Sequence, residues 1–576
     1  MMARAQRGQI RQTAAQPQGS FGHKSLPSPT NGLVLSENLA DMPPKSAVVL
    51  LNGVPTLTDV RVRGGSIKVA NIGTAVKSLF TYRAGSVNKF FAAGGGGVYD
   101  ITTPVDAETV PTAEFTGQSG DEYSVSTFSN SSGQYIFICN GEDDVQHFDG
   151  TTWATPTITG TTSADLSQGF SYRNRMFFVV KNSLKFAYLA VNAIAGAASE
   201  FELTGVFRRG GSLVFGARWS QDSGDGMDDR AVFVTDLGEV AIYEGADPSD
   251  PADWRLVGRY DITPPLGNKA FTYAGGDLII LTQDGMVPLS AAIQKEPSTL
   301  TLAALSRPIE PIWKEEAVRR LDDWQVVEIP KLNLGIVSLP SGGEYRSRCF
   351  AVNLQTSRWG VYEGWDTRCV GEFLSDGYFG ANDGYIYKME EGGSDDGDPY
   401  IFACAYAPDD MGSPGMQKTM KMGRGVFRAR DNFRGKISVA MDYDVQFGLA
   451  PDAGLDVSAV STWDTGLWDT ALWDGGQSLQ TLTDWQSLGR TGFSASMLVQ
   501  ATISNATDPK ASLDVVGIPG TTTVADGIIA PRLTGEQLRL KNGAYSALNN
   551  EGTIVYVTLP DGSPAGKTVN VTTIGY

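Results

Sequence analysis

One loose unit recurs between residues 90 and 390: an apolar strand, a turn of Gly, Asp or Asn, and a second strand that carries an aromatic residue. The turns contain Asp-Gly, Asn-Asp-Gly or Gly-Gly, which reach the positive φ angles of tight hairpins, and β-branched or aromatic residues flank them as strands require. The chain is therefore predicted to form hairpins at residues 90–101, 135–148, 174–186, 232–243, 278–287 and 378–387.

The spacing of these hairpins indicates how they are arranged. Successive hairpins lie about 40 to 55 residues apart, which is typical of four-stranded propeller blades with long loops. An array of β-sandwiches is the alternative that this spacing leaves open. We expect an all-β fold, with a β-propeller of about six irregular blades, then a small antiparallel β-sandwich, and an extended N-terminal arm.

An acidic, glycine-rich joint at residues 390–397 marks the main change of pattern. The predicted domains are an arm over 1–60, a propeller over 61–395, a sandwich over 396–530 and a C-terminal extension over 531–576.

One helix is expected within the propeller, near residues 308–321. Ile312, Trp313 and Val318 can share a face there, and Glu315 and Glu316 each precede an arginine at i,i+4. The helix interrupts the propeller as an insertion does, and we interpret it as a connector that packs against a blade edge.

The composition suits a globular, turn-rich all-β protein, since 41% of the 576 residues are hydrophobic, 19% are charged and 67 are glycine. No apolar run is long enough for a membrane span, and the N-terminus lacks the apolar core of a secretory signal, so synthesis in a cytosol is expected. The four cysteines follow no CxxC spacing, and we interpret them as small buried apolar groups.

The chain offers little for catalysis, because it has only two histidines, His23 and His147. GxSxG, HExxH and GxxxxGK[ST] motifs do not occur. Paired carboxylates for glycoside hydrolysis stay open in principle, because 64 Asp and Glu residues make chance pairs certain. We expect no enzymatic activity, no cofactor and no metal site.

Residues 461–476 place a Trp-Asp pair at every fifth residue, at Trp463, Trp468 and Trp473. A period of five fits neither a strand nor a helix, so an irregular arm is expected. This Trp-Asp arm either folds back on its own sandwich or anchors a neighbouring subunit, because tryptophan is favoured at binding hot spots. A calcium loop is disfavoured, because the alternate-position oxygen ligands are missing.

The first 29 residues carry Arg4, Arg7, Arg11 and Lys24 but no acidic residue, and they cannot bury a core alone. We expect this segment to order on an acidic partner or a neighbouring copy; a disordered tail is the alternative. Direct nucleic-acid binding is disfavoured by the net charge of −18. The predicted subunit-interface residues are Arg4, Arg7, Arg11, Trp463, Trp468 and Trp473.

Several phrases together resemble the tail nozzle proteins of short-tailed bacteriophages, also called tail tubular protein B. They are LNGVPTLTDVRVRGG at 51–65, VKSLFTY at 76–82, DGMVPLS at 284–290, RWGVY at 358–362 and the Trp-Asp arm. The similarity spans roughly residues 45 to 520. None of these phrases is a chemical signature, so the resemblance is one of arrangement.

The resemblance implies a structural virion protein, assembled in the host cytoplasm. It would form a homo-oligomeric ring, expected to be a hexamer, beneath a ring of adaptor proteins, and would extend the channel through which genomic DNA leaves. The acidic balance suits a lumen that DNA slides through without specific binding, although net charge also serves solubility. Outside the similarity, residues 538–540 and 554–557 are predicted to form a strand pair for docking a fibre or needle.

The alternative function is a propeller that binds or cleaves a surface glycan. Tryptophans of the Trp-Asp arm in an open pocket near paired acids would favour it, and tryptophans buried against another copy would favour assembly. A cellular scaffold like the WD-repeat proteins is weaker, because the blades lack the Gly-His and strand-ending Trp-Asp pattern.

Overall fold

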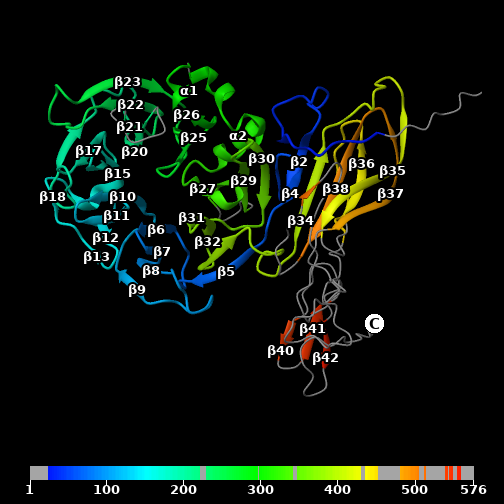
Figure 1. The fold of residues 1–576 in the computed structure, drawn as a ribbon, viewed down its shortest axis with the longest axis horizontal. Coiled ribbons are helices and arrows are strands. Elements are labelled where there is room, and N and C mark those ends of the chain that lie inside the picture. The colour runs from blue at the N-terminus through cyan, green and yellow to red at the C-terminus, as the bar shows by residue number, and fades with distance from the viewer. Residues whose placement is uncertain are drawn as a thin grey trace, which may run out of the picture.

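The computed structural model describes residues 24–220, 229–295, 297–340, 347–429, 435–451 and 480–504, with short strands at 512–513, 539–541, 544–548 and 554–558. This part of the chain is all-β apart from two short α-helices and a few 3₁₀ turns. Small sheets surround a common centre, and a unit of longer strands stands beside them (Figure 1). The predicted fold class, a β-propeller followed by a β-sandwich, is confirmed.

Four blades of the propeller are four-stranded antiparallel sheets. The first has β6 (Ser78–Ala84), β7 (Val87–Gly94), β8 (Gly97–Asp100) and β9 (Ala113–Thr116), and the second has β10 (Ser124–Asn130), β11 (Gly133–Cys139), β12 (Gln146–Phe148) and β13 (Trp153–Ala154). The third has β15 (Leu166–Tyr172), β16 (Arg175–Val180), β17 (Lys185–Tyr188) and β19 (Ser199–Glu202), flanked by η1 (Ser163–Asp165) and the small pair β14 (Ile158–Thr159) and β18 (Gly196–Ala197). The fourth has β20 (Leu213–Trp219), β21 (Arg230–Thr235), β22 (Glu239–Glu244) and β23 (Arg255–Asp261).

Two further sheets are blades of their own. One has three strands, β24 (Phe271–Ala274), β25 (Asp277–Thr282) and β26 (Gly285–Pro288). The other combines β31 (Cys369–Phe373), β32 (Asp376–Gly380) and β33 (Tyr385–Met389) with β5 (Ser66–Asn71), so an early strand closes the ring against a late one. These six sheets agree with the predicted propeller.

The remaining sector of the ring belongs to a larger sheet. It contains β27 (Gln325–Ile329), β28 (Leu334–Ser338), β29 (Arg348–Asn353) and β30 (Arg358–Glu363), with η4 (Pro330–Leu332) in the first turn. Strand β27 contacts β24 and β31, the inner strands on either side. The sheet then continues past β30 through β2 (Ser46–Leu51), β34 (Tyr400–Tyr406), β38 (Ala495–Ile503) and β36 (Lys436–Met441), with β1 (Gly32–Leu33) beside β2. One nine-stranded sheet therefore runs through both units.

All six predicted hairpins are present, and each forms the second and third strands of a blade. Their turns use the residues expected of them: Gly95 and Gly96 have φ of 60° and 76°, and Gly285 has φ of 140°. The hairpin of β28 and β29 was missed, and its turn lies outside the described residues.

The predicted extended arm over residues 1–60 is wrong for its second half. The apolar run at 47–51 buries Ala47 and Leu50 as β2, in the middle of the large sheet. Strands β3 (Gly53–Pro55) and β4 (Val60–Val62) then enter the second sheet of the sandwich, so residue 61 does not begin the propeller. Apolar strands of this kind are stable only when paired and covered, which explains their recruitment.

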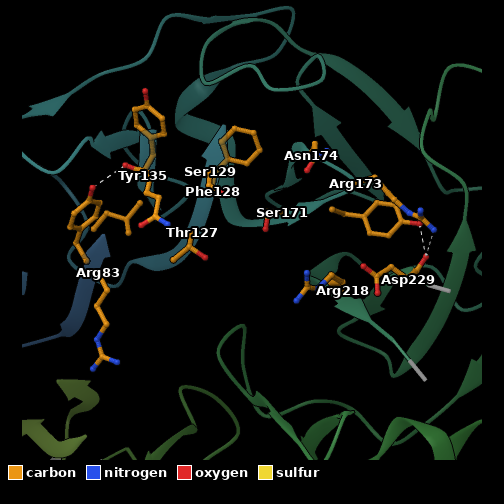
Figure 2. Close-up of a pocket in the computed structure, with 14 residues that line it drawn as sticks. Arg83, Thr127, Phe128, Ser129, Tyr135, Ser171, Arg173, Asn174, Arg218 and Asp229 are labelled. Carbon is orange, nitrogen blue, oxygen red and sulfur yellow. Dashed lines mark hydrogen bonds between the residues drawn. The ribbon is translucent and has the colours of Figure 1, made fainter. Parts of the chain in front are cut away.

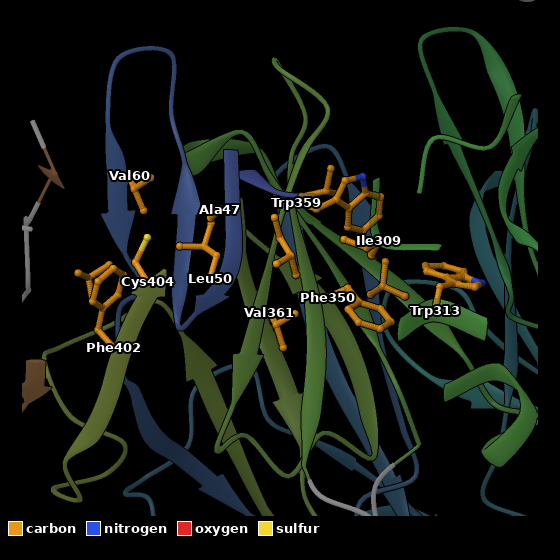
Figure 3. Close-up of a cluster of buried hydrophobic side chains, with 14 of the residues drawn as sticks. Ala47, Leu50, Val60, Ile309, Trp313, Phe350, Trp359, Val361, Phe402 and Cys404 are labelled. Carbon is orange, nitrogen blue, oxygen red and sulfur yellow. The ribbon is translucent and has the colours of Figure 1, made fainter. Parts of the chain in front are cut away.

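That second sheet has the order β3, β4, β39 (Ser512–Leu513), β35 (Lys418–Ala429) and β37 (Gln480–Gly492). Val60 and Phe427 from this sheet and Phe402 and Val499 from the large sheet are buried in one cluster. The same cluster reaches Trp313 and Phe350 in the propeller, and Figure 3 shows it running across the large sheet. The two units therefore share one hydrophobic core.

The predicted helix is present as η3 (Arg307–Ile309) followed by α2 (Glu310–Arg319). With α1 (Leu289–Ala292) and η2 (Pro297–Ala303), it follows the three-stranded blade, and α1 and η2 contact β26, where a fourth strand would lie. Trp313 is fully buried and donates its indole N–H to Thr282 O at 2.9 Å, but Val318 is 78% exposed, so the predicted three-residue face is wrong at that position. The helix packs against blade edges as a connector.

In the C-terminal extension, β40 (Arg539–Lys541), β41 (Ala544–Leu548) and β42 (Ile554–Thr558) form a three-stranded sheet. The predicted direct pairing of 538–540 with 554–557 is wrong, because β41 lies between the two strands. Among the described residues, none of the helices combines the length and apolarity that crossing a membrane requires.

Candidate functional site

Arg63 lies between β4 and β5, where the chain passes from the sandwich into the propeller. Its side chain is fully buried, and its guanidinium holds both oxygens of Asp395, at 2.6 and 2.8 Å. The centroids of Tyr400 and Trp365 are 3.8 and 4.8 Å from Arg63 Cζ. Because Tyr400 belongs to the sandwich strand β34 and Trp365 follows the propeller strand β30, these four residues, the Arg63 clamp, join the two units.

All five N–H donors of the Arg63 guanidinium have acceptors. Beyond the two bonds to Asp395, Nε donates to Asn52 Oδ1 at 2.9 Å, and the terminal nitrogens donate to the carbonyl oxygens of Gly64 and Glu363 at 2.8 and 3.1 Å. Burial opposes the charged form, but the charge and hydrogen bonds of Asp395, together with the neighbouring Tyr400 and Glu390, outweigh it, so the pKa of Arg63 is raised above its ordinary value. The clamp is thus a fully satisfied buried ion pair.

Two glycines beside Arg63 allow the backbones to approach closely. A Cβ on Gly65 would lie 1.9 Å from Ser394 O, and a Cβ on Gly64 would lie 2.6 Å from the backbone of Glu390. The Glu390 carboxylate pairs with Arg61 at 2.7 Å and accepts the Gly64 N–H at 2.8 Å. The acidic joint that the sequence marks as a boundary is therefore bound tightly to the 61–65 segment.

The inner strands of the blades surround the propeller axis, and a cavity of about 430 Å³ opens where several of them begin. Glu122 and Asp323 line it, and Arg368 pairs with Glu122 and lies 3.6 Å from Asp323. Nearby, Lys269 Nζ lies 3.4 Å from Ser78 Oγ. Burial lowers the pKa of Lys269, and burial together with neighbouring carboxylates raises the pKa of Asp323. This start-side cavity combines carboxylates with cations that offset their charge.

A larger cavity of about 700 Å³ opens where the inner strands of the first four blades end. Arg83, Thr127, Ser171 and Arg218 supply one lining residue from each of these blades (Figure 2). At its fourth-blade side, Asp229 accepts the Tyr172 hydroxyl through its backbone oxygen at 2.9 Å. We call this the end-side cavity.

The described residues offer little for acid–base, thiol or metal chemistry. His147 lies in β12 against Tyr135 and Phe137. Its Nδ1 has no hydrogen-bond partner among the described residues, and burial lowers the pKa of the imidazole. The four cysteines are buried, as predicted, and burial raises each thiol pKa, to about 11 for Cys349 and about 12 for Cys369. Within the described ranges, no three His, Cys, Asp or Glu side chains are grouped so that they could hold a metal ion.

The predicted interface residues, Arg4, Arg7, Arg11, Trp463, Trp468 and Trp473, lie outside the described residues, as do His23 and the whole Trp-Asp arm. The clamp and the two cavities were missed by the sequence reasoning. The available signal was Arg63 itself, an arginine that directly follows the strand with the buried Val60 and Val62 and precedes two glycines.

No protein-family model matches the chain, and no curated protein matches it. Solved structures with a similar fold include YCF48 bound to D1 peptide, at 9% identity and a TM-score of 0.33, covering 56% of this chain and 94% of that one. YCF48 from Cyanidioschyzon merolae shares 10% identity at a TM-score of 0.35, covering 57% and 99%. The WD40 β-propeller domain of Doa1 shares 9% identity at a TM-score of 0.35, covering 57% and 97%.

Proposed function

We propose that this chain is a structural subunit of a short-tailed phage virion, a tail nozzle protein whose copies form a ring that extends the DNA-ejection channel. The phrase-level resemblance of residues 45 to 520 to tail tubular protein B motivates the proposal. Its partners would be further copies of itself, expected as a hexamer, and the adaptor proteins of the head-to-tail connection. Genomic DNA would pass through without specific binding.

The continuous sheet is the observation that carries the proposal. A wall segment of a conduit has to keep its shape under load, and two domains on a flexible linker would not. Here β30 pairs with β2, the core crosses the junction, and the Arg63 clamp fixes the 390–397 segment. The propeller and the sandwich therefore support each other as one rigid body.

Charge supports the same role. The chain carries a net charge of −18, and carboxylates along a lumen repel phosphates, so a duplex can slide rather than adhere. The proposal requires that Asp and Glu gather on the lumen face of the assembled ring. The sheet of β40 to β42 would offer a docking element for a fibre or needle.

Native mass spectrometry of the full-length protein, with negative-stain images of the same sample, tests the proposal. The expected result is a closed ring of about six copies with a central opening, since a heterologous interface generates a ring when its rotation closes. A monomer at every concentration, which also fails to bind connector proteins purified from short-tailed phages, would refute it.

A further inference from the structure

We propose that the end-side cavity binds a short neutral oligosaccharide, a chain of uncharged sugar units. This inference is independent of the ring, because the cavity lies within one propeller. A cavity of about 700 Å³ falls within the range of small-molecule sites. Its lining offers one buried carboxylate and several uncharged polar side chains, and these groups carry the argument.

The first argument is an unpaired buried acceptor. Asp229 lines the cavity and is only 6% exposed, but its Oδ1 accepts no hydrogen bond in the described part of the chain. The fold uses the backbone oxygen of this residue, which accepts the Tyr172 hydroxyl at 2.9 Å, and leaves Oδ1 without a donor. A buried carboxylate oxygen without a donor is costly, so it points to a ligand that supplies one.

The second argument is a set of unpaired hydroxyl and amide groups on the neighbouring blades. Thr127 in β10, Ser171 in β15 and Asn174 in the turn after β15 line the cavity, and their side chains make no hydrogen bond to the described residues. Figure 2 shows Thr127 and Ser171 around the same opening as Asp229. Hydroxyl and amide side chains both donate and accept hydrogen bonds, so a ligand with several hydroxyls matches them.

The lining arginines do not call for an anion, because each of them already has a partner. Arg83 donates to both oxygens of Glu372, at 2.7 and 2.8 Å. Arg173 donates to the backbone oxygen of Asp229 at 3.4 Å, and Arg173 and Arg218 take part in further interactions. An anionic ligand would therefore find no unpaired arginine, and the carboxylate of Asp229 would repel it.

The other ligand classes fit less well than a neutral sugar. A cationic ligand would meet three arginines in the same lining, and an apolar ligand would leave the hydroxyls and the carboxylate unpaired. A neutral sugar supplies hydroxyl donors for Asp229 and both donors and acceptors for the uncharged side chains. Because these groups are spread over the second, third and fourth blades, a chain of sugar units can meet them together.

Isothermal titration calorimetry of the full-length protein tests the inference with matched trisaccharide probes. Chitotriose and cellotriose are neutral, the fully deacetylated glucosamine trimer is cationic, and trigalacturonate is anionic. Saturable binding of at least one neutral probe is expected, and both charged trimers should bind more weakly than that probe. Failure of both neutral probes, or equal or tighter binding of a charged trimer, overturns the inference.

Two variants and a control locate the site. Asp229→Asn keeps the shape of the side chain but loses the charged acceptor, so binding of the neutral probe should weaken about tenfold. Thr127→Val removes an exposed hydroxyl, should weaken binding about threefold, and keeps the proposal testable if the buried variant fails to fold. Thr116→Val, at an exposed position on the outer strand β9, is the matched control and should change nothing. Unchanged affinity in both Asp229→Asn and Thr127→Val would place the binding elsewhere and overturn the inference.

Discussion

The Arg63 clamp allows a sharp test of how the two units are joined. Arg63→Met replaces a fully buried cation by an apolar side chain of similar length. Among the described residues, it leaves the Asp395 carboxylate, which is 17% exposed, with Trp365 and Ser66 as its side-chain donors. Removing one partner of a buried ion pair costs about 3 to 5 kcal/mol, because the remaining charge is desolvated without compensation. The same range is expected for Asp395→Asn, which leaves the guanidinium in the core.

The double variant Arg63→Met/Asp395→Asn removes both charges and should cost clearly less than the sum of the single changes, because no unpaired charge remains. Arg255→Met is the control: its partner Glu244 lies at the surface, and a change of within about 0.5 kcal/mol is expected.

Urea unfolding followed by tryptophan fluorescence measures these differences in the free energy of unfolding. If the clamp couples the units, Arg63→Met should also split one cooperative transition into two, with the sandwich unfolding first. The reasoning is refuted if Arg63→Met destabilises no more than Arg255→Met, or if the double variant costs the full sum.

Three further predictions follow from single features. Gly65→Ala should destabilise the junction by about 2 kcal/mol or more, because its Cβ would overlap Ser394 O, whereas Gly415→Ala, with open space around it, should be neutral in the same urea assay. The Glu239 carboxylate is buried and accepts the N–H groups of Arg208 and Arg209 at 3.0 and 2.8 Å; burial opposes its charge, but these bonds and Arg259 lower its pKa. A lowered carboxyl pKa contributes stability that is present above about pH 4.5 and lost as the pH falls through the folded value, so Glu239→Gln should flatten the acid side of a melting-temperature profile; an unchanged profile would contradict this. Finally, the four thiols should not react with a disulfide reagent at pH 8 until the protein is unfolded, and one fast-reacting thiol in the native protein would count against the burial described here.

The blade hairpins could be predicted because their information is local. Each turn places glycine, asparagine or aspartate where φ has to be positive. Over the few flanking positions, apolar residues either alternate with polar ones or form a short continuous run, as is typical of strands. The turn at Gly95 and Gly96 is an example, because no distant residue is needed to specify it. The burial of the cysteines follows from composition and spacing in the same way.

The failures concern residues whose role depends on a distant partner. Residues 1–60 precede the first predicted hairpin and begin with a basic segment that has no acidic residue, so they were assigned to an arm; only pairing with distant strands, such as that of Leu51 with Val361 and Ala403, makes the second half part of a sheet. Val318 was placed on the buried face of the helix because helical period alone does not say which side meets the core. Both cavities, likewise, exist only because four or more blades converge.

The sequence by itself thus determined the fold class, the hairpins and the lack of familiar catalytic motifs, since turn chemistry and residue types act over short distances. The tertiary structure decided that β5 closes the ring against β33, that one sheet continues from the propeller into the sandwich, and that Arg63 meets Asp395 across 332 positions. The physical reason is that a strand can pair with any segment of suitable register, and a buried charge with any group of opposite sign. Which segment lies close enough to do so depends on the whole fold.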